Sequence, residues 1–151
     1  MNVGQGLPPA QRRTWAEQQL TPGRILYVHY PLTYETKDKY IVIADDDDWP
    51  RVLVVNSNRR ENVERHPDLT GRQLLLKPSD YSFLDHDSYL NCTEVLQGLT
   101  KEDIVSQLVA DVNRAVGELL DSTRAEVMAA VCGARTVATT DQSAILTALR
   151  Q

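Results

Sequence analysis

Apolar residues in the first two thirds of the chain fall into short runs separated by polar or turn-forming segments. Residues 24–30 (RILYVHY) and 39–44 (KYIVIA) are rich in β-branched and aromatic side chains, which is typical of strands. Residues 51–55 (RVLVV) are apolar without alternation, so we expect a strand that is buried on both faces. Residues 73–76 and 82–95 supply two or three further strands. Several short strands at close spacing predict a small, mostly antiparallel β-barrel or a strongly bent sheet.

Within residues 82–95, side chains that can be buried alternate with polar ones. In an extended strand the even-numbered positions from Leu84 to Cys92 lie on one face, and the odd-numbered positions from Asp85 to Asn91 lie on the other. The first set is mostly able to be buried and the second is mostly polar. We therefore expect this strand to have one core face and one solvent face.

Helical patterns flank the strands on both sides. Residues 9–20 begin with a proline suited to a first helical turn and contain good helix formers, with Trp15 and Leu20 as their only large apolar residues. We expect a short surface helix there, ended by residues 21–23 (TPG). Beyond Gly98 the period changes, and Thr100 with Asp103 forms a capping-box signature. Apolar residues then recur at helical spacing: Ile104, Leu108, Val112, Val116 and Leu119.

Two more helices are expected towards the C-terminus. Thr123 with Glu126 repeats the capping pattern, Gly133 is placed to end that helix, and Thr139 begins a last short one. The whole pattern predicts an α+β fold and a single domain. It consists of an N-terminal arm and helix over residues 1–21, a barrel over 22–98 and a helical tail over 99–151 packed on the barrel. No helix is expected between the strands.

Composition and charge narrow the function classes. At 151 residues the chain is long enough to bury a core, and its net charge of −5 argues against nonspecific coating of nucleic acid. Residues 51–77 nevertheless contain six basic and three acidic side chains, a local +3 that suits one anionic ligand. No apolar run is long enough to span a bilayer, and the N-terminal residues lack the order of a signal peptide. With Cys92 and Cys132 far apart in sequence, we expect a reduced, cytoplasmic protein with free thiols.

Four segments in a fixed order give a family resemblance. They are residues 24–31 (RILYVHYP), 39–43 (KYIVI), 52–57 (VLVVNS) and 87–95 (DSYLNCTEV). In this order and spacing the chain resembles the MazF/PemK-like toxins of type II toxin–antitoxin systems, over roughly residues 22–95. The resemblance implies an SH3-like barrel, usually a homodimer, which in active members cleaves single-stranded RNA without a metal. It also implies an antitoxin-like protein partner.

The resemblance also implies site residues. The family's catalytic pair is an arginine that opens the second strand and a threonine after the third, and Lys39 and Ser57 stand at the matching positions. Lysine keeps the positive charge but lacks the planar fork that grips a phosphate, and serine keeps the hydroxyl. Glu35 lies near an acidic residue of the first loop in some members. Glu35 and His86 are the candidates for proton transfer.

Residues 56–60 form the stretch best suited to contact an RNA backbone. Their side chains donate hydrogen bonds and the local charge is positive. The alternative is a polar loop whose arginines pair with neighbouring glutamates. The residues assigned to RNA binding are Asn56, Asn58, Arg59 and Arg60.

Two other polar clusters could form a metal site or a catalytic site, but a structural role is favoured for each. The four aspartates at residues 45–48 lack the spacing of a calcium loop and are expected to form a solvated turn. Asp85 and His86 would point to opposite faces of a strand, so a hydrogen-bonded, partly buried His86 is favoured over a catalytic triad. We therefore expect neither a metal nor another cofactor.

Two functions from different classes remain open. In the first, the chain is an RNA-binding protein and a metal-independent endoribonuclease. In the second, the same barrel is a non-catalytic interaction module that binds a protein partner through its groove or its helical tail. Convergence of Lys39, Ser57 and Arg59 in one cleft favours the first, whereas their dispersal favours the second. A third hypothesis, a metal-dependent hydrolase that uses Asp85, His86 and the aspartates at residues 45–48, is the least favoured.

Overall fold

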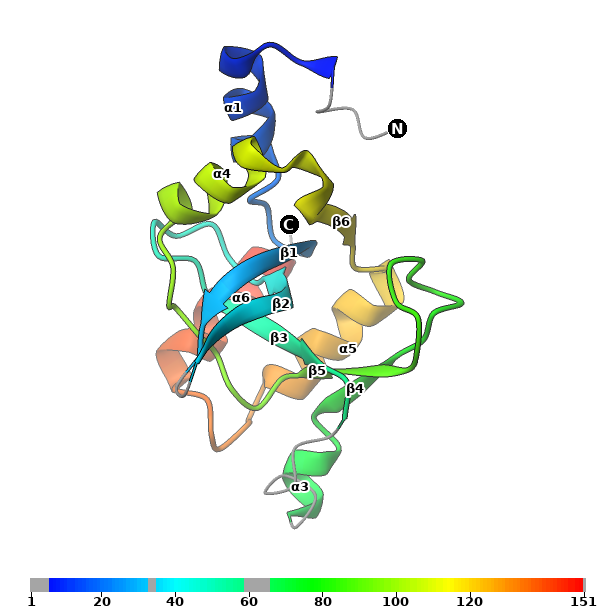
Figure 1. The fold of residues 1–151 in the computed structure, drawn as a ribbon. Coiled ribbons are helices and arrows are strands. Elements are labelled where there is room, and N and C mark those ends of the chain that lie inside the picture. Colours follow the sequence, from blue (N-terminus) through cyan, green and yellow to red (C-terminus); the bar gives the residue numbers. More distant parts are fainter. Residues whose placement is uncertain (1–5, 33–34, 59–65, 151) are drawn as a thin grey trace.

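A single curled antiparallel sheet organises the computed structural model, which describes residues 6–32, 35–58 and 66–150 (Figure 1). Its strands are β1 (Arg24–Pro31), β2 (Thr36–Ile43), β3 (Val52–Asn56), β4 (Gln73–Leu76), β5 (Ser88–Asn91) and β6 (Ala115–Glu118). Their order is β4-β5-β3-β2-β1-β6, and each neighbouring pair is antiparallel. Among the described residues, β4 and β6 each pair with one neighbour, so the sheet is an open half-barrel. The predicted α+β class and the bent antiparallel sheet are confirmed.

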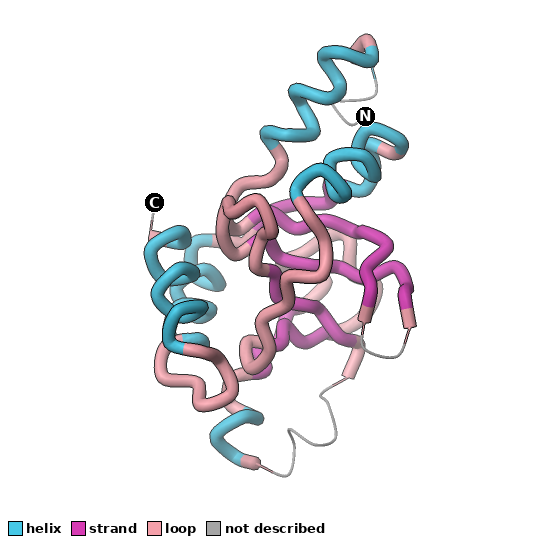
Figure 2. The backbone as a smooth tube through the Cα atoms, turned by 90° about the vertical axis from the view of Figure 1, so that its left-hand side faces the viewer, coloured by secondary structure: helices cyan, strands magenta, loops and turns pink. Residues whose placement is uncertain are grey.

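Both faces of this sheet are covered by helices. Helices α5 (Asp121–Val131) and α6 (Thr139–Leu149) pack on one face, and α1 (Pro9–Gln18) and α4 (Lys101–Ala110) pack on the other. Figure 2 shows one helix pair above the strands and the other to their left. Strand β3 lies between them, with Leu53 and Val55 in one core cluster and Val52 and Val54 in the other. This confirms the prediction, from its continuous apolar run, that β3 is buried on both faces.

The tail departs from the predicted helical pattern after Ala110. Helix α4 begins with the predicted capping box of Thr100 and Asp103, but it ends at Ala110. A 3₁₀ turn, η2 (Val112–Arg114), and strand β6 follow. The predicted helical stripe through Leu119 is therefore wrong. Pairing with the open edge of β1 satisfies the backbone of residues 115–118 and outweighs the local helical period.

The later helices also begin differently from the prediction. Helix α5 starts at Asp121, so Thr123 does not cap it but lies buried inside it, with its hydroxyl 2.7 Å from the hydroxyl of Tyr81. The end of α5 is as predicted, because Gly133 follows it with a φ of +77°, a conformation that glycine adopts without strain. Helix α6 begins at the predicted Thr139.

Between β3 and β5 the structure corrects two further predictions. One helical turn, α3 (Pro67–Thr70), lies in the region where no helix was expected; Leu69 anchors it by burial, and Figure 1 shows it away from the centre of the sheet. Within residues 82–95 the strand is confined to β5. Leu84 and Cys92 are buried as the alternation predicts, whereas His86, expected to be partly buried, has a side chain that is 55% exposed.

The aspartate-rich turn is only partly solvated. Asp45 is buried, and its carboxylate accepts hydrogen bonds from the backbone N–H and the guanidinium of Arg51, each at 2.8 Å. Arg51 also donates to Asp141 on α6 at 2.7 Å, and these bonds raise the pKa of the guanidinium, Asp141 contributing most. The turn between β2 and β3 is thus fastened to α6. The expectation of a fully solvated turn is wrong for its first residue, because Arg51 neutralises it.

Candidate functional site

A cavity of about 650 Å³ lies where the β1–β2 hairpin, the end of β3 and the segment after β5 meet. Its apolar wall consists of Pro31, Leu32, Val54 and Leu96, and the rest of its lining is polar or charged. Val54, Leu32 and Leu96 also belong to, or pack against, the core cluster under α1 and α4. The cavity therefore opens on the same face of the sheet as these two helices.

Strand register places Lys39 and Asn56 together in this cavity. Ile41 pairs with Val54, and continuing that antiparallel register by two positions brings Lys39 opposite Asn56. The Lys39 ammonium donates a hydrogen bond to the Asn56 side-chain oxygen at 3.1 Å. Ser57 follows β3 directly and lines the same cavity.

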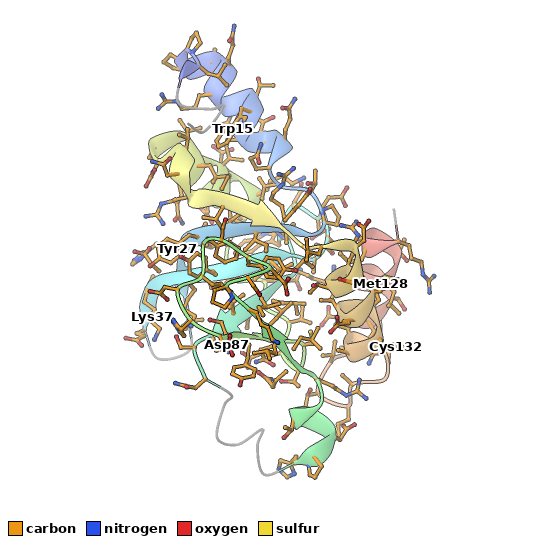
Figure 3. The ribbon with its side chains drawn as sticks, turned by 90° about the vertical axis from the view of Figure 1, so that its right-hand side faces the viewer. Trp15, Tyr27, Lys37, Asp87, Met128 and Cys132 are labelled. Carbon is orange, nitrogen blue, oxygen red and sulfur yellow. The ribbon has the colours of Figure 1, made fainter. Side chains whose placement is uncertain are left out.

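The hairpin between β1 and β2 brings two more charges to the cavity. Strand β2 begins at Thr36, three residues earlier than predicted, so Lys39 is its fourth residue and Lys37 lies closer to its start. Residues two apart on a strand share a face, so both lysines line the cavity. Figure 3 shows Lys37 near the tip of the hairpin. Its ammonium lies 3.2 Å from the carboxylate of Glu35, which also lines the cavity.

Five of the residues predicted from the sequence therefore meet in one place: Glu35, Lys39, Asn56, Ser57 and Asn58. The two predicted arginines, Arg59 and Arg60, lie outside the described residues. His86 is not brought to the cavity.

His86 lies in the loop that covers the other face of β2. Tyr40 follows Lys39 on the strand and so points to the opposite face, where its hydroxyl donates to the Phe83 carbonyl oxygen at 3.4 Å. That contact holds the loop of residues 81–87, which includes His86, on the far side of the sheet. His86 is bonded to Asp85 instead, and this hydrogen bond is the main cause that lowers the pKa of the Asp85 carboxyl.

Three polar or charged residues of the cavity were not predicted from the sequence: Lys37, Asn91 and Glu94. Asn91 was placed on the solvent face of its strand by alternation, yet it is only 2% exposed. A polar residue within a strand of apolar neighbours was the available signal. Glu94 had no signal of its own, since its position depends on how the segment after β5 turns back towards β3.

The charged side chains of the cavity's described lining are balanced in number. Two lysines, Lys37 and Lys39, and two glutamates, Glu35 and Glu94, line it, so their formal charges cancel. Glu35 and Lys37 pair at the exposed rim, with side chains 61% and 50% exposed, whereas Lys39 is half-buried. The cavity thus combines cations and hydroxyl or amide donors, which suit a phosphate, with carboxylates that can accept a proton.

A second cavity, of about 510 Å³, lies between the aspartate-rich turn and α6. Asp45, Asp46 and Asp47 line it, and its cation, Arg51, is already bound by Asp45 and Asp141. This surface is unsuited to an anionic ligand. No group of His, Cys, Asp or Glu side chains that could hold a metal ion occurs in the part of the chain that the structure describes. Within the same residues, no helix has the length and apolarity needed to cross a membrane.

Neither a comparison with protein-family models nor one with curated proteins finds a match to this chain. Residues from all four segments of the family resemblance line the first cavity, among them Pro31, Lys39, Ser57 and Asn91.

Proposed function

We propose that the chain binds single-stranded RNA in the cavity around Lys39 and cleaves it without a metal, by attack of the RNA's own 2′-hydroxyl. One observation carries this proposal. Glu35, Lys39 and Ser57, which come from separate segments and were assigned from the resemblance to MazF/PemK-like toxins, line one cavity. Of the three residues whose convergence was expected to favour this function, Lys39 and Ser57 line the cavity and Arg59 lies outside the described residues.

In this reaction the 2′-oxygen attacks the adjacent phosphorus and the 5′-oxygen of the next nucleotide leaves. The products are a 2′,3′-cyclic phosphate and a free 5′-hydroxyl. Lys39 supplies positive charge to the crowded phosphate, and Ser57 donates a hydrogen bond to one of its oxygens. Arg59 and Arg60 are assigned to the RNA backbone on either side.

Proton transfer is assigned to the pair at the rim. Glu35 takes the proton of the 2′-hydroxyl, and the Lys37 ammonium gives one to the departing 5′-oxygen. Because the two groups lie 3.2 Å apart, the proton on Glu35 can pass back to Lys37 after each turnover. His86 has no role in this scheme, since its loop lies on the other face of β2.

The proposal also includes a more specific fold assignment. We assign the curled sheet to the SH3-like barrels, because the strands that carry the four segments are consecutive neighbours in the order β5-β3-β2-β1. A homodimer and an antitoxin-like protein partner are what the resemblance implies for an SH3-like toxin, and both belong to this proposal.

A second function is favoured by the charge balance of the cavity. Among the described residues its lining has two lysines and two glutamates, and the whole chain carries −5, so long-range attraction for a polyanion is weak. In this alternative the groove is non-catalytic and binds a segment of a partner protein.

Incubation with end-labelled single-stranded RNA of mixed sequence, with a chelator present, separates the two functions. The wild type should cleave, Lys39→Ala should lose about 10²–10³ in rate, and Lys39→Arg should keep or raise the activity. Lys77→Ala is the matched control, because Lys77 is exposed and outside the cavity lining. Intact RNA after long incubation with the wild type would reject the nuclease and favour the interaction module.

A further inference from the structure

Asn91 combines deep burial with a place in the wall of the cavity. It is 2% exposed and still lines the cavity that holds Lys39. Its side-chain oxygen accepts three hydrogen bonds: from the backbone N–H of Thr93 at 2.9 Å, from the Thr93 hydroxyl at 2.5 Å and from the Gln73 amide at 2.5 Å. A backbone N–H can only donate, so the atom of Asn91 that faces it must be the oxygen. The orientation of the amide is therefore fixed.

Because its side-chain oxygen already accepts three hydrogen bonds, only the NH₂ group of Asn91 can bond to a ligand. Within the described residues that nitrogen makes no hydrogen bond, and it is not among their fully buried, unpartnered polar atoms. Because Asn91 lines the cavity and its oxygen is taken, the NH₂ group is the side-chain donor that it can present there. An asparagine that pairs with adenine uses its oxygen and its nitrogen together, and Asn91 cannot do so because the oxygen is taken.

The hydrogen bonds around Asn91 hold its side chain in one orientation, but they leave another buried polar atom without a partner. The Thr136 hydroxyl, in the segment between α5 and α6, donates to the Thr93 carbonyl oxygen at 2.6 Å and so ties the network to the helical tail. Gln73 is 4% exposed, and its side-chain oxygen has no hydrogen-bond partner among the described residues. A buried acceptor without a partner destabilises a fold, and an apolar residue would avoid that loss. Apolar residues would fill the same space without this loss, so packing does not explain why the residues are polar. The need to hold the Asn91 amide in one orientation does explain it.

We infer that Asn91 is a specificity-determining residue, which donates a hydrogen bond to the keto oxygen of an RNA base and so favours uracil or guanine over cytosine or adenine. This inference rests on the proposed function. The neighbouring wall of Val54 and Leu96 is apolar and suits a base, while Lys39 and Ser57 lie where the phosphate is assigned. Uracil and guanine carry an acceptor oxygen where cytosine and adenine carry an amino group, and a buried donor facing an amino group would remain unpaired.

Binding of 2′-O-methyl oligonucleotides, which cannot be cut by their own 2′-hydroxyl, tests this inference by fluorescence anisotropy. Oligo(U) and oligo(C) are a close pair, because the two bases differ at the keto or amino group and at the adjacent ring nitrogen. We expect the wild type to bind oligo(U) about tenfold more tightly, which corresponds to about 1.4 kcal/mol. No preference of the wild type for oligo(U) would overturn the inference without any variant.

The variant Asn91→Asp keeps an oxygen for Thr93 and Gln73 but turns the group that faces the cavity from a donor into an acceptor. We expect the preference to reverse towards oligo(C), whose amino group can donate to the new carboxylate. Lys39→Ala should weaken both complexes and leave their ratio unchanged. Equal weakening of both complexes by Asn91→Asp would overturn the role of Asn91 while the proposed function stands. Failure of the wild type to bind either oligonucleotide would overturn the proposed function and, with it, this inference.

Discussion

Replacing Arg51 by methionine removes the guanidinium that joins the β2–β3 turn to α6. Asp45, Arg51 and Asp141 have side chains that are 7%, 19% and 25% exposed. Hydrogen bonds to charged groups contribute about 1.5–3 kcal/mol each, and the more exposed bond to Asp141 contributes less than the one to Asp45. Without Arg51 the Asp45 carboxylate keeps only its backbone hydrogen bond. Since breaking a buried pair typically costs about 3–5 kcal/mol, we expect that loss of unfolding free energy for Arg51→Met.

Urea denaturation followed by tryptophan fluorescence measures this loss, with an unchanged dependence on urea as the sign that the transition is comparable. The corresponding drop in Tm is about 6–20 °C for a chain of this size. Adding Asp45→Asn to Arg51→Met should recover at least ~1 kcal/mol, because no buried charge is left unpaired. Arg13→Met is the control, since the Arg13–Glu102 pair is exposed and its loss should leave the midpoint nearly unchanged. A loss below ~1 kcal/mol for Arg51→Met, or no recovery in the double variant, would refute this account of the turn.

Three further predictions test other parts of the fold. Leu108→Ala should cost about 2–5 kcal/mol in the same urea titration, because Leu108 is fully buried between α4 and the sheet. Burial raises the pKa of Cys92 to about 12, so iodoacetamide at pH 8 should label the exposed Cys132 and leave Cys92 unlabelled until urea is added, as mass spectrometry would show. The hydrogen bond from the Thr100 backbone lowers the pKa of the Asp103 carboxyl below its ordinary 3.8, so its stabilising effect is present above pH 3.8 and lost as the pH falls through the folded-state value. The stability difference between wild type and Asp103→Asn should therefore shrink below pH 3.8 in urea titrations at several pH values.

Strands and helices were predictable where residues close together in the sequence determine them. The continuous apolar run of β3 signalled burial on both faces, and the structure provides a helix pair on each side. The capping box of Thr100 and Asp103 fixed the start of α4, because both partners lie within one turn. Strand β6 was not predictable in the same way. Val112 and Val116 fit a helical period, and only the unpaired edge of β1, far away in sequence, makes an extended backbone the better partner.

The candidate site was predictable to the extent that strand register determines it. Lys39 and Ser57 were found by matching strands, and the β2–β3 register then brings them together with Asn56. Asn91 and Asp45 could not be found this way. Alternation or loop composition assigned each of them to solvent, whereas segments distant in sequence bury them: the Gln73 side chain beside Asn91 and the α6 residue Asp141 beside Arg51.

The claim that RNA is cut by its own 2′-hydroxyl in the cavity around Lys39 has one direct test. The cut site in a single-stranded RNA is first mapped, and the same RNA is then made with one 2′-deoxy sugar at the nucleotide that precedes the cut. With a chelator present, the protein should leave that position intact, because the attacking oxygen is missing, and should still cut the unmodified RNA to a cyclic phosphate end. Cleavage at the deoxy position at an unchanged rate, or loss of all cleavage on adding the chelator, would contradict the account.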